Sequence, residues 1–230
     1  SGSAGSTNAT TGTSASFNKP RGITLVGNNL YVADGGSNKI RKIVISTGAV
    51  TTIAGSGSAG SANGTGTSAT FSLPYGITTD GNSLYVADLY NHKIRRIVIS
   101  TGVVSTFAGS GSAGSTNATT GTSASFNQPR GITSDGTNLY VSDGVNQRIR
   151  KIVISTGVVT TLAGSSQGYT NGNGTSAQFY NPFGVSTDGT NLYVAEHGNH
   201  TIRKIALRET ETADLSLHNL DDDTEVTVAV

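Results

Sequence analysis

Four histidines are the side chains of this chain best suited to holding a metal ion: His92, His197, His200 and His218. A catalytic zinc ion needs three protein ligands that converge on it. His197 and His200 share one predicted turn, but the first and third of the four sequence repeats described below contain no histidine, and the chain has no cysteine. The sequence therefore predicts no metal site, no cofactor and no catalytic residue, with the histidines on the surface.

Basic residues recur on one segment of every repeat, interleaved with isoleucine. Such a series could bind a polyanion, either RNA or an acidic polysaccharide. The segments lack companion aromatic residues on which bases could stack, so nucleic acid is not expected as a partner. We expect instead that these cations are solvated and discourage edge pairing of strands. They are Lys39, Arg41, Lys42, Lys93, Arg95, Arg96, Arg148, Arg150, Lys151, Arg203 and Lys204.

One acidic residue stands six positions before an isoleucine of each basic segment. A ring of such carboxylates could hold a metal ion. Because the acid recurs in every repeat, we expect it to serve its own repeat rather than a unique site. The prediction is that each side chain caps the backbone of its own turn. The acids are Asp34, Asp88, Asp143 and Glu196.

One position varies while its neighbours stay fixed: the residue after each proline, which is Arg21, Tyr75, Arg130 or Phe183. Arginine and aromatic side chains together suit a small recognition patch, and we take these four as the candidate ligand-binding residues. The alternative interpretation is that they fill a narrow hole on the axis of the fold.

Repeats organise these residues. All four prolines of the chain, Pro20, Pro74, Pro129 and Pro182, mark equivalent positions in consecutive repeats, and residues 1–18 recur letter for letter at 110–127. Each repeat contains four short runs rich in Val, Ile, Thr and Tyr, separated by turn residues; in the third they are 130–135, 138–143, 148–155 and 158–164. A repeat of 40–55 residues with four strands is typical of a β-propeller blade.

The repeats resemble the NHL repeat family, whose pattern is a Pro-x-Gly-Ile start, then Leu-Tyr-Val-Ala-Asp, then an Asn-His-x-Ile element. Here residues 74–97 read "PYGITTDGNSLYVADLYNHKIRRI", with Asn91 and His92 at the name-giving pair. The Gly/Ser-rich linkers are similar to those of a bacterial subtype. The resemblance covers residues 1–205 and implies four four-stranded antiparallel blades, at about 20–55, 74–109, 129–164 and 182–207.

Residues 206–230 depart from the pattern and form an acidic C-terminal tail of one or two expected strands. Family members usually close with six blades, so four could form a small ring, part of a longer array, or half of a ring shared by two chains. Residues 213–220 could replace the missing outer strand of the fourth blade. Alternating Val226, Val228 and Val230 predict an edge strand or a hairpin packed on that blade, or a strand donated to a neighbouring subunit in a filament.

The composition limits the classes of function that the chain can have. Charged residues are 13% of the chain, about half of the usual share of ~25%. Neither a membrane-spanning run nor a nucleophile paired with a base is present. We therefore expect a non-catalytic propeller scaffold or binding module, extracellular or on a cell surface, with a protein partner or self-association. A metal-dependent lyase of the propeller type and a binder of RNA or acidic polysaccharide are the alternatives.

Overall fold

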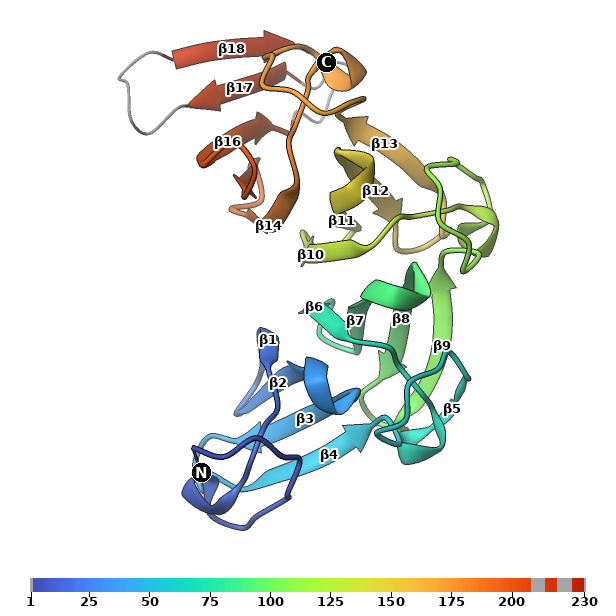
Figure 1. Cartoon of the computed structure of the whole chain (residues 1–230), viewed down its shortest axis with the longest axis vertical. Coiled ribbons are helices and arrows are strands. Elements are labelled where there is room, and N and C mark those ends of the chain that lie inside the picture. Colours follow the sequence, from blue (N-terminus) through green and yellow to red (C-terminus); the bar gives the residue numbers. More distant parts are fainter. Residues whose placement is uncertain (1, 208–213, 219–224, 230) are drawn as a thin grey trace.

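The computed structural model describes residues 2–207, 214–218 and 225–229. The described residues form short antiparallel strands and single turns of 3-10 helix, arranged as sheets that fan out around a common opening (Figure 1). The predicted fold class, an all-β propeller built from antiparallel blades with a β tail, is confirmed. No helix in the described part of the chain is long and apolar enough to cross a membrane.

Each blade is a meander of consecutive strands that starts at the concave side of the array (Figure 1). Blades 1 to 3 have four such strands, and three strands of blade 4 share one sheet. The linker strand β5 (Gly64–Thr65) extends the outer edge of blade 2. The blade strands are β1 (Pro20–Val26), β2 (Asn29–Asp34), β3 (Lys39–Val44) and β4 (Val50–Ala54); β6 (Pro74–Thr79), β7 (Ser83–Asp88), β8 (Lys93–Val98) and β9 (Val103–Ala108); β10 (Pro129–Ser134), β11 (Asn138–Asp143), β12 (Arg148–Val153) and β13 (Val159–Ala163); and β14 (Pro182–Thr187), β15 (Asn191–Glu196) and β16 (Thr201–Ala206).

Single 3-10 turns occur at two places in the repeat. One type connects the second and third strands of a blade and ends on a residue with left-handed backbone, such as His92 at φ 55°. The other type lies in the linker before each blade. The first type comprises η2 (Gly35–Ser37), η4 (Leu89–Asn91) and η6 (Gly144–Asn146), and the second comprises η1 (Gly12–Ser14), η3 (Gly66–Ser68), η5 (Gly121–Ser123) and η7 (Gly174–Ser176).

An aspartate closes the first hairpin of blades 2 to 4. Asp135 accepts hydrogen bonds from the backbone N–H groups of Thr137 and Asn138, at 2.8 and 2.6 Å, and from the hydroxyl of Tyr140 at 2.8 Å. These bonds fix the turn between β10 and β11 in the way expected of an aspartate that binds its own turn. The same bonds recur around Asp80 and Asp188.

A buried ion pair joins the second and third strands of every blade. Arg150 Nη1 lies 2.9 Å from Asp143 Oδ2, and neither side chain is exposed. The same guanidinium donates hydrogen bonds to the Ser125 and Thr116 carbonyl oxygens and to Asn117 Oδ1, all in the linker before the blade. Each blade is thereby bonded to the linker that precedes it. The equivalent pairs are Arg41–Asp34, Arg95–Asp88 and Arg203–Glu196.

The predictions for these residues were wrong in two respects. The middle arginine of each basic segment is buried, not solvated, because the linker covers that face of the blade. The acids bind this arginine and a linker N–H, as Asp143 accepts from Asn127 N at 2.7 Å, instead of capping the backbone of their own turn. Within its own turn, Asp143 accepts a hydrogen bond from the Asn146 side chain at 2.8 Å and not from the backbone.

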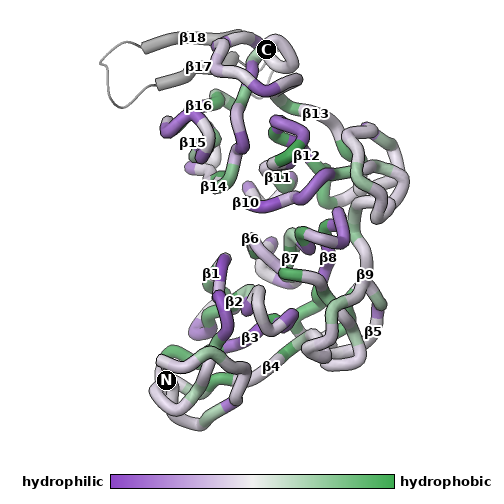
Figure 2. Tube along the Cα trace, viewed as in Figure 1, coloured by the Kyte–Doolittle hydropathy of each residue, from purple (hydrophilic) through white to green (hydrophobic). Residues whose placement is uncertain are grey.

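The apolar sides of the blades pack on one another. Tyr31 and Ile40 of blade 1 share a buried cluster with Ile77, Leu84 and Ile97 of blade 2. Equivalent residues form a cluster at each of the next two junctions. Figure 2 shows apolar residues along the strands between neighbouring blades, whereas the linkers are paler. Each Å² of apolar surface that is buried contributes about 25 cal/mol, so these junctions are the main source of cohesion between blades.

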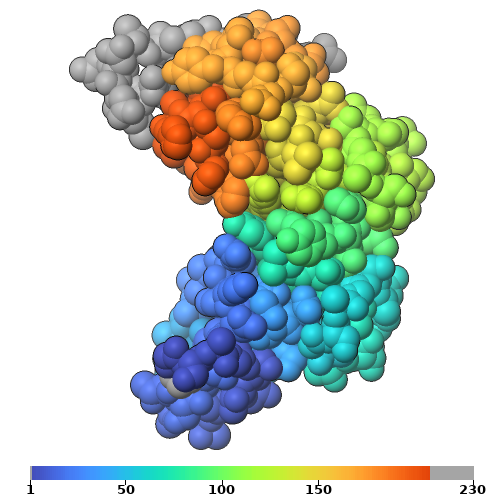
Figure 3. Space-filling view, in the orientation of Figure 1, coloured from blue at the N-terminus to red at the C-terminus, as the bar shows by residue number. Residues whose placement is uncertain are grey.

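The four blades form an open arc. The inner strands β1, β6, β10 and β14 contact one another in that order. The arc is open between β1 and β14, and the space-filling view shows the same hollow on its concave side (Figures 1 and 3). Of the three arrangements expected from the sequence, a small closed ring of four blades is not the one in this structure.

The tail forms a hairpin. β17 (Asp214–His218) pairs antiparallel with β18 (Glu225–Ala229), so that Val226 stands opposite Leu217 and Val228 opposite Leu215. β17 lies beside β16 but belongs to a separate sheet, so it does not continue the ladder of blade 4 (Figure 1). Val230 lies outside the described residues. Strand donation to another subunit remains a prediction.

Candidate ligand-binding site on the inner strands

The residue after each repeat proline lies in a β-bulge at the start of an inner strand. In blade 3, Pro129 is opposite Asp143 and Ile132 is opposite Val141, so the register shifts between them. The same shift occurs in the other three blades. Because a bulge re-aims the side chain that it contains, it turns this position away from the blade ladder.

Glycine follows the variable residue because neighbouring inner strands approach closely there. A Cβ on Gly22 would lie 2.8 Å from the Tyr75 carbonyl oxygen of the next blade. A Cβ on Gly76 would collide with the carbonyl oxygen of Arg130, and one on Gly131 with that of Phe183. No larger residue fits these three positions without moving a strand.

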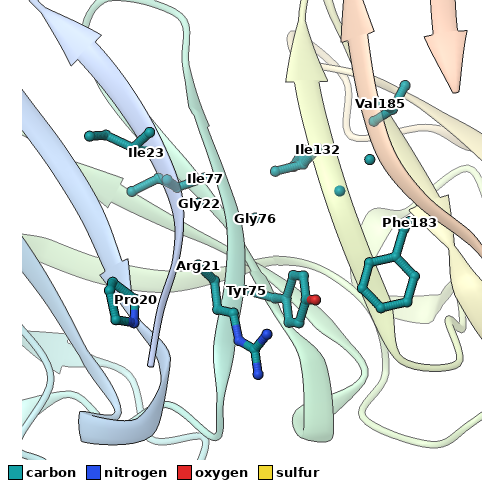
Figure 4. A pocket seen from close by; sticks show the side chains of 12 residues that line it. Pro20, Arg21, Gly22, Ile23, Tyr75, Gly76, Ile77, Ile132, Phe183 and Val185 are labelled. Atoms are coloured by element: carbon teal, nitrogen blue, oxygen red, sulfur yellow. The ribbon is translucent and has the colours of Figure 1, made fainter. Parts of the chain in front are cut away.

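The four predicted residues come together, and we call them the axial cluster: Arg21, Tyr75, Arg130 and Phe183. The guanidinium carbon of Arg21 lies 5.0 Å from the centre of the Tyr75 ring, and that of Arg130 lies 4.2 Å from the Phe183 ring. Tyr75 and Phe183 meet edge to face, with ring centres 5.7 Å apart. Figure 4 shows Arg21, Tyr75 and Phe183 at one end of the hollow along the inner strands.

Two further residues, which the sequence did not point to, support the axial cluster. The ring of His197 lies 5.3 Å from that of Phe183, although the histidine was expected only to be on the surface. Asn181 accepts a hydrogen bond from the Arg130 guanidinium through its Oδ1 atom. Asn181 stands two residues before Phe183 in the sequence, whereas His197 follows β15 and reaches the Phe183 ring only through the fold.

Glycine at the neighbouring turn makes room for each arginine. Gly144 would place a Cβ 3.2 Å from Arg130 Cδ, and Gly35 would place one 3.3 Å from Arg21 Cγ. The blades with an aromatic residue at the variable position have Leu89 or His197 at this turn instead. Arginine with glycine therefore alternates with an aromatic residue and a larger partner around the arc.

Three residues of the axial cluster, Arg21, Tyr75 and Phe183, form one end of a hollow of about 450 Å³ on the concave side. The side chains of Ile23, Ile77, Ile132 and Val185 line its other end, with the inner-strand glycines between (Figure 4). The hollow thus offers an apolar wall beside the Arg21 cation, while Arg130 lies on the Phe183 ring and is not part of the lining. That combination suits a ligand with an anionic group and an apolar face.

The two arginines of the axial cluster carry charge that no carboxylate neutralises. In the described part of the chain, every ion pair involves the buried third-strand arginines and not Arg21 or Arg130. Burial lowers the pKa of Arg130, and the nearby Tyr75 and Tyr90 oppose that change. Because arginine stays protonated at neutral pH, the site favours an anion.

Metal-ligating side chains are not gathered in this way. Over residues 2–207 and the two tail strands, no three His, Cys, Asp or Glu side chains form a group that could hold a metal ion. His197 and His200 line one shallow hollow on blade 4, together with Glu196. Glu196 is already engaged, since it accepts hydrogen bonds from Arg203 and Asn199.

Comparison with curated proteins finds similar sequences, among them one that is named for NHL repeats. NHL repeat-containing protein 2 of Homo sapiens is 34% identical over 163 residues, which is 64% of this chain and 22% of that protein. Protein SUPPRESSOR OF QUENCHING 1, chloroplastic, of Arabidopsis thaliana is 29% identical over 211 residues, which is 83% of this chain and 20% of that protein. The chain therefore spans about a fifth of the length of these relatives. No family model matches it.

Comparison with solved structures shows the fold. An auxiliary nutrient binding protein from Bacteroides ovatus has a TM-score of 0.66 at 20% identity, with 85% of this chain and 50% of that one covered. Virginiamycin B lyase from Staphylococcus aureus has a TM-score of 0.54 at 21% identity, with 83% and 53% covered. These likenesses show the fold, that of blades of a β-propeller. In its repeat sequence the chain is similar to NHL repeat-containing protein 2.

Proposed function

We propose that the chain is a non-catalytic binding module that holds an anionic ligand at the axial cluster. The observation that carries this proposal is the meeting of Arg21, Tyr75, Arg130 and Phe183, from four different strands, with no carboxylate beside either arginine in the described residues. Filling an axial hole requires bulk but not two cations.

The ligand class that fits best is an acidic saccharide. Guanidinium groups bind carboxylates through paired N–H donors, and the faces of Tyr75 and Phe183 offer apolar surface for the C–H face of a sugar ring. The basic third strands do not extend this site, because their central arginines are buried in ion pairs. A polymer that depends on many surface cations is therefore a weaker candidate than a short oligosaccharide.

A titration tests the proposal. Uronic-acid oligosaccharides and their neutral counterparts are added to the protein, and binding is followed by calorimetry. We expect binding of the acidic series only. Arg130→Gln should weaken it by about tenfold or more, since a hydrogen bond to a charged group contributes about 1.5–3 kcal/mol. Lys151→Gln on the outer part of blade 3 is the matched control and should bind normally. Equal binding of Arg130→Gln and the parent would contradict the site.

The runner-up function is a metal-dependent lyase, since virginiamycin B lyase shares the fold. Likeness at 21% identity concerns the fold and not the reaction. Metal analysis of the purified protein separates the two proposals: a stoichiometric divalent ion that is lost in a His197→Ala variant would favour the lyase.

We also propose that the module acts outside the cell or on its surface, as its low charge and its richness in Ser, Thr, Asn and Gly suggest. Protease treatment of intact cells, with the protein followed by antibody, tests this. Loss of the protein from intact cells is the expected result, and protection until the cells are lysed would contradict it.

A further inference from the structure

We propose that blade 4 of one copy of this chain docks on blade 1 of a second copy, through the contacts that already join consecutive blades. This inference concerns assembly and is independent of the ligand proposed above. Each junction inside the chain joins two different faces: the leading face of the earlier blade and the trailing face of the later one. Within the described residues, one face of each kind has no blade packed against it. The leading face of blade 4 contains Tyr193, Ala195 and Ile202, and the trailing face of blade 1 contains Ile23, Leu30 and Ile43.

The leading face is buried wherever a blade follows. Its tyrosine is at most 2% exposed and its isoleucine is fully buried in blades 1 to 3. In blade 4 the same positions, Tyr193 and Ile202, are 39% and 37% exposed. Blade 4 has the same residue types at these two positions as blades 1 to 3, although here they are exposed to solvent. The face keeps the chemistry of a junction.

The trailing face shows the same contrast at the other end. Ile77 and Ile132, on the inner strands of blades 2 and 3, are at most 6% exposed because the preceding blade covers them. Ile23 occupies that position in blade 1 and is 58% exposed, with the exposed Leu25 beside it. An isolated apolar side chain on a surface is ordinary, but two complementary faces at opposite ends of one array are not.

Glycine gives a second, geometric indication. Gly22, Gly76 and Gly131 are each needed because the backbone of the next inner strand lies where a Cβ would be. Gly184 is the equivalent residue of blade 4. A Cβ there would meet only Ala195 Cβ, at 3.6 Å, so nothing inside the described part of this chain requires glycine. A further inner strand on blade 4 would require it.

A hydrogen bond across each junction gives a third indication. The residue that ends each 3-10 turn accepts a bond from the backbone N–H before the next repeat proline: Asn38 Oδ1 from Leu73 at 2.9 Å, and His92 Nδ1 from Gln128 at 3.1 Å. Gln147 Oε1 accepts from Asn181 at the third junction. The two unused halves are the His200 ring and the Lys19 N–H, neither of which has such a partner in the described residues. Docking would join them.

Both end faces are hollowed at the place where an inner strand would sit. A hollow of about 290 Å³ on blade 4 is lined by residues that include Phe183, Ala195, His200 and Ile202. One of about 310 Å³ on blade 1 is lined by Phe17, Gly22, Ile23, Val32 and Ile43 among others. Each contains residues of the unused half-junction.

A second copy is the occupant that these observations favour, because every copy carries both halves of the junction. The contact joins different faces, so it is heterologous and can repeat from copy to copy. It closes into a ring where the curvature of the arcs permits and otherwise continues as a chain. In either case it extends the row of inner strands that bears the axial cluster beyond a single arc.

Light scattering on the intact chain over a range of micromolar concentrations tests the proposal. We expect a mass of two copies or more, against 23.4 kDa for one. Ile23→Arg and Ile202→Arg, both on exposed side chains, should each reduce the protein to one copy while leaving its circular dichroism unchanged. A single-copy mass for the parent protein at every concentration would overturn the proposal.

Mixing the two variants shows which faces meet. The Ile23→Arg copy retains its blade 4 face and the Ile202→Arg copy retains its blade 1 face, so an equimolar mixture should form one-to-one pairs. Absence of pairs in the mixture, with assembly in the parent, would rule out docking of blade 4 on blade 1. Deleting residues 221–230 is the second control: assembly that needs those residues would indicate strand donation by the tail instead.

The Gly184→Ala variant separates an effect on assembly from an effect on the stability of the single chain. In the single chain this methyl group has room, so the melting temperature of the Ile23→Arg monomer should not change. In the assembly it would meet the next inner strand, so the dissociation constant should rise by about tenfold or more. Gly131→Ala is the matched variant inside the chain and should lower the melting temperature itself. Equal assembly of parent and Gly184→Ala would contradict the proposed contact.

Discussion

The buried arginine of each third strand organises the polar interior of its blade. Burial raises the pKa of Asp143 and lowers that of Arg150, while their mutual attraction and hydrogen bonds oppose both changes. A buried pair of this kind costs desolvation and contributes little net stability, but breaking it leaves a charge without a partner. One face of the Arg150 guanidinium lies over the Phe126 ring, at 5.1 Å, so the linker also supplies an aromatic contact.

Arg150→Met should lower the free energy of unfolding by about 3–5 kcal/mol, because Asp143 would then be buried without its cation. Urea denaturation measures the change. Lys151→Met is the matched control, since it alters the next residue of the same strand and should change stability by less than about 0.5 kcal/mol. Similar effects of the two substitutions would show that the pair has no such structural role.

At the scale of the element, the hairpin aspartates set the turn between the first two strands of blades 2 to 4. Burial alone would raise the pKa of Asp135, but hydrogen bonds from Asn138, Thr137 and Tyr140 lower it below its usual value. Hydrogen bonds from Asn191 and Thr190 likewise lower the pKa of Asp188. Blade 1 has Val26 at this position, so its hairpin is closed without a carboxylate.

These lowered pKa values predict a pH dependence. A carboxyl group with a lowered pKa in the folded state stabilises the fold above its unfolded pKa of about 3.9, and this contribution is lost as the pH falls through the folded value. The difference in unfolding free energy between the parent and Asp135→Asn should therefore shrink below about pH 4. Burial raises the pKa values of Asp88 and Asp143. Both residues are present in the parent and in Asp135→Asn, so their contributions cancel in the difference between the two unfolding free energies.

Thermal melts from about pH 7 to about pH 2.5 measure this difference, a range that spans the unfolded carboxyl pKa. Asn28→Ser in the blade 1 turn, which contains no acid, is the control and should show the same difference from the parent at every pH. A constant difference for Asp135→Asn as well would mean that Asp135 does not hold its turn through its charge.

Sequence alone predicted the strands well, because alternating β-branched residues and turn residues mark them locally. The predicted run 138–143 coincides with β11. It also selected the axial cluster, since a variable position among fixed neighbours is visible in four repeats of one chain. It did not predict the burial of Arg41 and its equivalents, because that depends on the linker that folds back over the blade. The support of the cluster by His197 and Asn181 depends on three-dimensional neighbours in the same way.

At the scale of the whole molecule, blades differ in how many neighbours support them. Blades 2 and 3 have a blade on each side, whereas blades 1 and 4 each have an open face. In repeat proteins, stability is approximately a sum of the stability of each repeat and of its junctions. The end blades are therefore the first to open locally.

Hydrogen exchange on the Ile23→Arg monomer tests this. Amides of β6–β8 and β10–β12 should exchange more slowly than those of β14–β16. In the assembled parent protein the difference should decrease, since the end faces are then covered. Uniform protection along the monomer would show that the four blades open together as one unit.

The hydrogen-bond partners of the buried arginines determine how the fold tolerates the gain or loss of a repeat. Arg95 bonds within its own repeat, to Thr70, Ala62, Asn63 and Asp88, and Asn63 also binds Thr106 at the far edge of the same blade. An in-frame gain or loss of one linker with its blade consequently leaves no internal charge stranded. The identical segments 1–18 and 110–127 lie two repeats apart, so removing the residues from the start of one to the start of the other would take away two complete units of linker and blade.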